Sequence, residues 1–125
     1  MCNIDHIMEL LDWNNSSEEQ SEGIELAREV KCINVFLQPG PPYSKRVWEN
    51  CAKVLAERSD EELAPYLIHL LEWIEDLNWP GALCILERLR KYKDNNLIDF
   101  ALSECKRIAK ATDEGTWLNN LMMIR

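Results

Sequence analysis

The spacing of the apolar residues is the feature that most constrains the fold of this chain. In nearly every segment these residues recur at intervals of three and four, as in Val47, Trp48, Cys51, Val54 and Leu55. This is the period of an α-helix with one buried face. The pattern continues along the chain and predicts about seven helices and no strand, so we expect an all-α fold.

Local signals divide this pattern into separate helices. Ser16 and Ser59 each begin a capping box, with a glutamate three residues later that can bond back to the serine. Ser44 is a further expected N-cap, after the proline-rich loop at 38–42. Pro65 predicts a separate short turn before the next helix. For CINVFLQ, the segment that follows the second helix, we expect the buried end of a helix and then an extended loop.

Several features occur twice in the same order, about sixty residues apart. Each set begins with two leucines, an acidic residue and a tryptophan, followed by a glycine that is expected to begin a helix. A helix that contains a cysteine comes next, and then an acidic segment that is expected to start the following helix. The matching pairs are LLDW at 10–13 and LLEW at 70–73, Gly23-Ile24 and Gly81-Ala82, and the helices around Cys51 and Cys105.

Such a repeat is typical of helical units that bury their apolar faces by stacking on one another. We therefore expect one domain over residues 1–125, with pseudo-repeats at about 4–60 and 61–113 and a capping helix at 114–124. The expected architecture is a short α-solenoid whose helices pack antiparallel across short turns.

Three tryptophans belong to the repeated segments. Trp13 and Trp73 stand at equivalent positions beside paired leucines, so both are expected to be buried anchors. Trp79 has no counterpart in the first half and falls in a predicted turn. Two interpretations stay open for Trp79: it caps the core at the turn, or it stands exposed as an anchor for a partner.

The charge and the cysteines restrict the class of function. A net charge of −8 argues against nucleic-acid binding and against docking to an anionic membrane, and it favours encounter with a basic partner. Five widely spaced cysteines without a C-x-x-C motif predict a reducing compartment. With no signal peptide and no apolar stretch long enough for a membrane span, we expect a cytoplasmic protein.

Three segments resemble a known bacterial family, the domain of unknown function numbered 5071. They are SDEELAP at 59–65, LLEWIEDLNWPGA at 70–82 and the acidic turn before Trp117, so the resemblance covers about residues 59–118. The first half is similar instead to small HEAT-like proteins from bacterial toxin-immunity neighbourhoods. The resemblance implies an all-helical HEAT-like fold, and it implies no catalytic or cofactor-binding residue.

The residues themselves offer little for catalysis. His6 and His69 are the only histidines, and no motif for a metal site, an activated nucleophile or a phosphate loop is present. His69 is expected at the surface, and we expect no cofactor, no metal and no enzymatic activity.

The carboxylates are the more promising candidates. One predicted helix carries Glu72, Glu75 and Asp76, and the spacing i, i+4 puts Glu72 and Asp76 on the same face. The corresponding region of the first half contains Asp12, Glu18, Glu19 and Glu22. If the two units stack in parallel, these side chains form an acidic ridge beside Trp79 that can bind a basic partner. The alternative is a solvated helix face without a partner. The candidate partner-binding residues are Asp12, Glu18, Glu19, Glu72, Glu75, Asp76 and Trp79.

These observations favour a non-enzymatic protein-binding module, most concretely an immunity-type protein that neutralises a basic toxin partner. One alternative is a scaffold, adaptor or homodimerising protein. Another is a small ligand-binding protein or enzyme that uses His69, Glu72 and Asp76.

Overall fold

The computed structural model describes residues 3–124, and these residues form helices and turns without any strand. The all-α prediction is confirmed, with seven helices longer than one turn and a single-turn helix, α4. The α-helices are α1 (Ile4–Leu10), α2 (Ser17–Ala27), α3 (Trp48–Ala56), α4 (Asp60–Leu63), α5 (Leu67–Trp73), α6 (Ala82–Arg90), α7 (Asn95–Ala111) and α8 (Gly115–Leu121). Short 3-10 turns occupy Ile33–Phe36, Lys45–Val47 and Ala64–Tyr66.

The predicted start signals are confirmed. Ser16 and Ser59 each accept a hydrogen bond from the backbone N–H three residues later, and both capping boxes are complete. The Ser44 side chain accepts from the Arg46 N–H at the turn that leads into α3. The 3-10 turn that contains Pro65 separates α4 from α5, as expected from the missing proline N–H.

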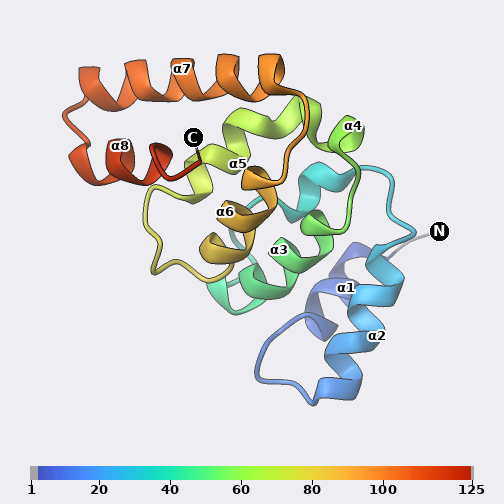
Figure 1. The fold of residues 1–125 in the computed structure, drawn as a ribbon. Helices are drawn as coiled ribbons and strands as arrows, with labels where there is room; N and C mark the ends of the chain where they lie inside the picture. The colour runs from blue at the N-terminus through green and yellow to red at the C-terminus, as the bar shows by residue number, and fades with distance from the viewer. Residues whose placement is uncertain (1–2, 125) are drawn as a thin grey trace.

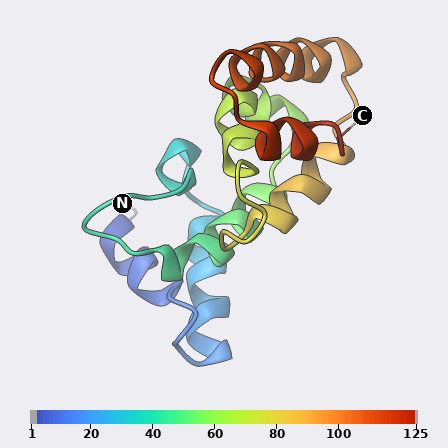
Figure 2. The same cartoon turned by 90° about the vertical axis from the view of Figure 1, so that its left-hand side faces the viewer.

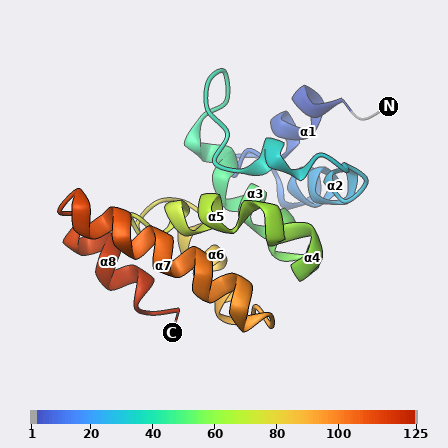
Figure 3. The ribbon, with the colours of Figure 1, turned by 90° about the horizontal axis from the view of Figure 1, so that it is seen from above.

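The helices form two groups joined through α3 (Figure 1). α1 packs on α2 at one end, whereas α5, α7 and α8 pack on one another at the other end. α3 contacts α2 on one side and α6 on the other. Figures 2 and 3 show the α1–α2 hairpin well away from α8. α5 and α7 run in the same direction, from the α4 side towards α8 (Figure 1).

One continuous apolar core runs through both groups. Burying each large apolar side chain contributes about 1.5–3 kcal/mol to the hydrophobic driving force, and every group of helices supplies such residues. The largest fully buried side chains are Trp73, Phe36, Met8, Leu11, Leu55, Leu63, Leu70, Leu71, Ile74, Ile85, Leu89 and Ile98.

Two polar side chains fasten the α1–α2 hairpin to α3. Asn50 is buried, and its amide nitrogen donates to the Leu11 carbonyl at 2.8 Å and to Gln20 Oε1 at 2.9 Å. Arg58 Nη2 donates to the carbonyls of Ala27 and Val30, each at 2.8 Å. These carbonyls lie at and just beyond the end of α2, where helices leave acceptors unpaired.

Three expectations about local structure are wrong. Trp13 is 45% exposed, because α1 ends at Leu10 and the chain has already turned out of the helix. Gly23 begins no helix; it lies inside α2, where a Cβ would come within 2.8 Å of Leu10 Cβ. Residues 33–36 form a 3-10 turn that is separate from α2, which has ended at Ala27.

Candidate functional site

The LLEWIEDLNWPGA segment contains the end of α5 and the turn into α6, and its tryptophans meet Trp48 of α3. The Trp48 and Trp73 rings are 6.0 Å apart, and the Trp48 and Trp79 rings are 5.9 Å apart, both edge to face. Trp73 is completely buried, and its Nε1–H donates to the Pro80 carbonyl at 3.0 Å. This segment is therefore a structural joint between α3 and the second half of the chain.

Gly81 lets the turn approach α3 closely. Its φ of +84° is in the left-handed region that favours glycine, and a Cβ there would lie 2.7 Å from Ala52 Cβ. The Gly81 N–H donates to Glu49 Oε2 at 2.6 Å, which satisfies a backbone group at the start of α6.

Trp79 packs at the turn in the way that the first of its two interpretations predicted. It is half-buried and packs against the core, while the ammonium of Lys45 lies 5.8 Å from its ring centroid and 5.5 Å from that of Trp48. A cation over an aromatic face adds to the packing of the joint. Trp79 thus caps the core at the turn and keeps only part of its surface exposed.

The acidic residues of the first half do not join those of the second. Asp12 forms an ion pair with Arg46 at 3.4 Å and accepts a hydrogen bond from the Asn14 N–H. Glu18 and Glu19 are exposed in the first turn of α2, and Glu19 closes the capping box. Figures 1 and 2 place the start of α2 far from α5 and α8. Glu18 and Glu19 therefore do not form one ridge with the carboxylates at the end of α5.

Carboxylates of the second half do gather, around the end of α5. We define the α5–α8 acidic surface by Glu72, Glu75 and Glu114. Glu75 and Asp76 were expected on the same helix as Glu72, but α5 ends at Trp73 and both lie beyond it, where Asp76 Oδ1 accepts from the Asn78 N–H at 2.8 Å. Burial raises the pKa of Glu75, and the negative charges of Glu114 and Glu72 and a hydrogen bond with Glu114 raise it further. Among the described residues, no basic side chain forms an ion pair with these three carboxylates or with Asp76. The fold therefore brings like charges together without neutralising them.

The packing of α8 on α5 explains how Glu114 reaches this surface. Trp117 Nε1–H donates to the Leu71 carbonyl at 3.0 Å, and the amide of Asn120 donates to the Ile74 carbonyl at 2.8 Å. Both donors are buried and pair with carbonyls at the end of α5. Glu114, immediately before α8, is thereby held against Glu75.

A buried thiol lies beneath the same surface. Burial raises the pKa of the Cys105 thiol to about 11, and the charges of Glu72, Glu104 and Glu75 add to this effect. Cys105 is on α7 and completely buried, so it stays protonated at neutral pH and packs as a small apolar residue.

His69 and the cysteines are the remaining residues considered for chemistry. His69 is exposed on α5, as expected. Within residues 3–124, no three histidine, cysteine or acidic side chains are placed to hold a metal ion. The four described cysteines are free thiols, while Cys2 lies outside the described residues. No helix in the described part of the chain has the length and apolar character to cross a bilayer.

A hollow that was not predicted from the sequence lies elsewhere on the surface. It measures about 690 Å3 and lies between the end of α3, the start of α4 and α6. Its basic side chains come from the segment RLRKYK, residues 88–93, which holds four of the fourteen basic residues. That local excess of positive charge in an acidic chain is the signal that could have revealed it.

Residues 45–124 match the model of one protein family, described as Domain of unknown function (DUF5071). The chain belongs to this family. The match extends the resemblance seen in the sequence from 59–118 to 45–124, and so it adds α3 to the family region. Neither the search of curated proteins nor the search of solved structures found a match.

The extent of the DUF5071 match agrees with the packing. The matched region begins at Lys45, whose side chain lies over Trp48 and Trp79. It contains the whole tryptophan joint, the α5–α8 acidic surface and the hollow beside α6. Asp12, Glu18 and Glu19 precede the matched region. Of the candidate partner-binding residues, Glu72, Glu75, Asp76 and Trp79 lie within it.

The raised pKa of Glu75 predicts a pH-dependent effect of the Glu75→Gln substitution. A carboxyl whose pKa is raised by folding favours the folded state below its ordinary pKa, and this contribution is lost as the pH rises through the raised pKa. The charged form therefore destabilises the protein at pH 7. Glu75→Gln should raise the free energy of unfolding at pH 7 by about 0.5 kcal/mol, the scale of like-charge pairs on helices, and leave it unchanged near pH 3.

Urea unfolding followed by circular dichroism at both pH values measures this effect. Glu18→Gln is a suitable control, because it removes a favourable charge at the start of α2 and should slightly lower stability at pH 7. A loss of stability in Glu75→Gln at pH 7 would contradict the inferred repulsion.

Proposed function

We propose that this protein is a non-enzymatic protein-binding module whose α5–α8 acidic surface binds a basic region of a partner protein. The observation that supports this most directly is the raised pKa of Glu75. Glu72, Glu75 and Glu114 are held together although their charges repel, and a cationic side chain of a partner would relieve that repulsion. A solvated helix face does not require an acid from the start of α8 to meet two acids at the end of α5.

The most concrete form of this role is an immunity-type protein that binds and neutralises a basic toxin. It is supported by the resemblance of the first half to HEAT-like proteins of toxin-immunity neighbourhoods, which is an argument by analogy. We further propose that the helices form a short HEAT-like solenoid with successive helices antiparallel, in a bacterial protein. The proposed compartment is the cytoplasm, in keeping with the free thiols of the described cysteines.

A scaffold or homodimerising role is the second candidate. It is favoured by α7, where Leu97 is 45% exposed and Phe100 is 67% exposed on the outer side of the helix. Exposed large apolar residues on one helix are typical of interaction surfaces. A monomer at high concentration in sedimentation equilibrium would exclude the homodimer.

Affinity capture from the native source tests the leading proposal. The wild-type chain is compared with the triple variant Glu72→Gln, Glu75→Gln and Glu114→Gln. The matched control is the triple variant Glu18→Gln, Glu22→Gln and Glu25→Gln, which removes the same charge from the surface of α2.

We expect the wild-type chain and the α2 control to recover the same protein in stoichiometric amount, with a basic surface, and the α5–α8 variant to lose it. Equal recovery by all three baits, or recovery of no stoichiometric partner by the wild-type chain, would argue against the proposal.

A further inference from the structure

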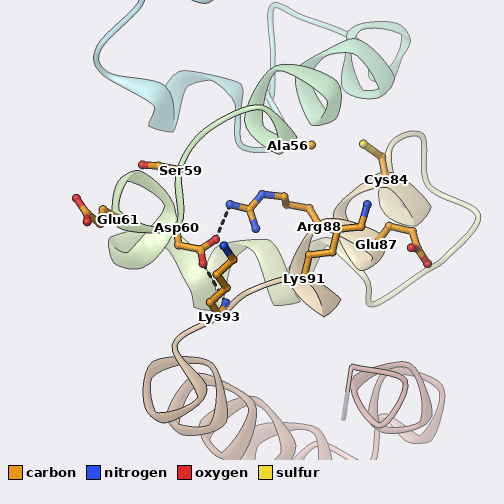
Figure 4. A pocket seen from close by; sticks show the side chains of 9 residues that line it. All are labelled: Ala56, Ser59, Asp60, Glu61, Cys84, Glu87, Arg88, Lys91 and Lys93. Atoms are coloured by element: carbon orange, nitrogen blue, oxygen red, sulfur yellow. Dashed lines mark hydrogen bonds and ion pairs between the residues drawn. The ribbon is translucent and has the colours of Figure 1, made fainter.

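The hollow beside α6 has features of a small-molecule site. Its volume of about 690 Å3 is within the usual range of ligand pockets, roughly 300–1,000 Å3. Figure 4 shows side chains from three separate segments around it: Ala56 at the end of α3, Asp60 at the start of α4, and Cys84 to Lys93 on and after α6. Residues 56–61 form one side and residues 84–93 the other, and these two stretches are separated in the sequence by α5 and the turn into α6, so the hollow is a product of the tertiary fold.

The charge inside the hollow is opposite to that of the whole protein. Arg88, Lys91 and Lys93 line it, and Figure 4 shows Arg88 and Lys93 beside Asp60 while Lys91 extends along the wall towards Cys84. The carboxylates of Glu61 and Glu87 point away from the centre in the same view. Asp60 is thus the one acid directed into a group of three cations.

Hydrogen bonds hold this arrangement in place. Asp60 Oδ1 accepts from Arg88 Nη2 at 2.6 Å, and Oδ2 accepts from the Lys93 N–H at 2.9 Å. Arg88 Nη2 also donates to the Arg58 carbonyl at 2.9 Å, and the Tyr92 hydroxyl donates to the Asp60 carbonyl at 3.0 Å. The segment after α6 is therefore tied to the start of α4, which fixes the backbone that carries both lysines.

The pKa of Asp60 agrees with this geometry. Burial by itself would raise that pKa, but the hydrogen bonds from the Lys93 N–H and Arg88 and their positive charges outweigh it, so the pKa of Asp60 is lowered. Asp60 remains ionised and neutralises Arg88, whose side chain is only 14% exposed. The charge of Lys93 also acts on Asp60, but among the described residues neither the Lys91 nor the Lys93 ammonium lies within 4.0 Å of a carboxylate oxygen.

We propose that this hollow binds a small phosphate-bearing molecule, with the ammonium groups of Lys91 and Lys93 as its anion-binding groups and Arg88 and Asp60 as their fixed support. Lysine binds phosphate as a compact point charge, and two lysines two residues apart on a fixed segment suit a multiply charged anion. The apolar wall at Ala56 and Cys84 leaves room for the uncharged part of the molecule. The site lies at the opposite end of α5 from the α5–α8 acidic surface and does not depend on the proposed partner.

Titration of the 15N-labelled full chain with inorganic pyrophosphate tests the proposal. Two-dimensional NMR spectra are recorded at constant ionic strength, with citrate as a carboxylate probe of comparable charge. Lys91→Gln with Lys93→Gln is the test variant, and Lys106→Gln with Lys110→Gln on α7 removes the same charge away from the hollow.

We expect pyrophosphate to shift the resonances of residues 59–61 and 88–93 in a saturable way, with a dissociation constant on the order of 1 mM. The affinity should fall by about tenfold or more in the Lys91 and Lys93 variant and stay unchanged in the α7 variant. Shifts that do not saturate, equal binding by both variants, or saturation by citrate but not by pyrophosphate would overturn the proposal.

Discussion

Trp73→Ala is expected to lower the free energy of unfolding by about 3–5 kcal/mol, the usual cost of removing a large buried aromatic side chain. Trp73 is completely buried, packs edge to face with Trp48 and bonds to the Pro80 carbonyl. Its removal leaves a cavity where α3, α5 and the turn into α6 meet. Urea unfolding followed by circular dichroism measures the loss.

Trp13→Ala is the matched control, because Trp13 follows paired leucines as Trp73 does but is 45% exposed. It should cost less than about 1 kcal/mol. If Trp73→Ala does not fold, Trp73→Phe keeps most of the packing and loses the indole hydrogen bond, at a cost of about 1–2 kcal/mol. Equal losses for Trp13→Ala and Trp73→Ala would contradict the assignment of Trp73 as the anchor of the joint.

Gly81→Ala should destabilise the protein by about 3 kcal/mol, because two separate costs act at this position. The left-handed backbone at φ +84° costs an L-residue roughly 1–2 kcal/mol. A Cβ would also lie 2.7 Å from Ala52 Cβ and 2.9 Å from the Trp48 carbonyl oxygen, and such overpacking costs about 1–3 kcal/mol. Differential scanning calorimetry should show a lower unfolding temperature.

Gly115→Ala serves as the control for this substitution. Gly115 begins α8, and a Cβ there would meet no atom within 4 Å. Alanine favours the helix and restricts the unfolded chain, so stability should stay the same or rise by up to about 1 kcal/mol. A Gly81→Ala protein as stable as Gly115→Ala would show that the turn does not need glycine.

The parts of the fold that depend on neighbouring residues could be predicted from the sequence. The capping boxes at Ser16 and Ser59 are of this kind, because the serine and its partner are only three residues apart. The separate turn at Pro65 follows from the missing proline N–H.

The differences between the two halves could not be predicted in this way, because tertiary packing decides them. Trp13 and Trp73 have nearly identical local sequences, yet α1 ends at Leu10 and α5 continues to Trp73. Gly23 and Gly81 both precede an apolar residue, but only Gly81 lies at a turn pressed against α3. A repeated motif therefore does not fix where a helix ends or what it packs against.

The candidate surfaces show the same division. Glu72, Glu75 and Asp76 stand out in the sequence as close neighbours, but α5 ends at Trp73, so Glu75 and Asp76 lie beyond the helix and not on its face. Glu114 comes to Glu75 only because Trp117 and Asn120 dock α8 on the end of α5. Asp12 was expected on the same surface. It lies just after α1 instead, and it pairs with Arg46 in the 3-10 turn before α3, a contact between residues far apart in the sequence.

The affinity of the captured partner for purified wild-type and variant chains is the most direct test of the proposed binding surface. Isothermal titration calorimetry at low and moderate salt should show binding at least about tenfold weaker for the Glu72, Glu75 and Glu114 variant, with a reduced dependence on salt. The α2 variant with Glu18, Glu22 and Glu25 replaced should bind as the wild-type chain does. Unchanged affinity in the first variant, or an equal loss in the second, would contradict binding through the α5–α8 acidic surface.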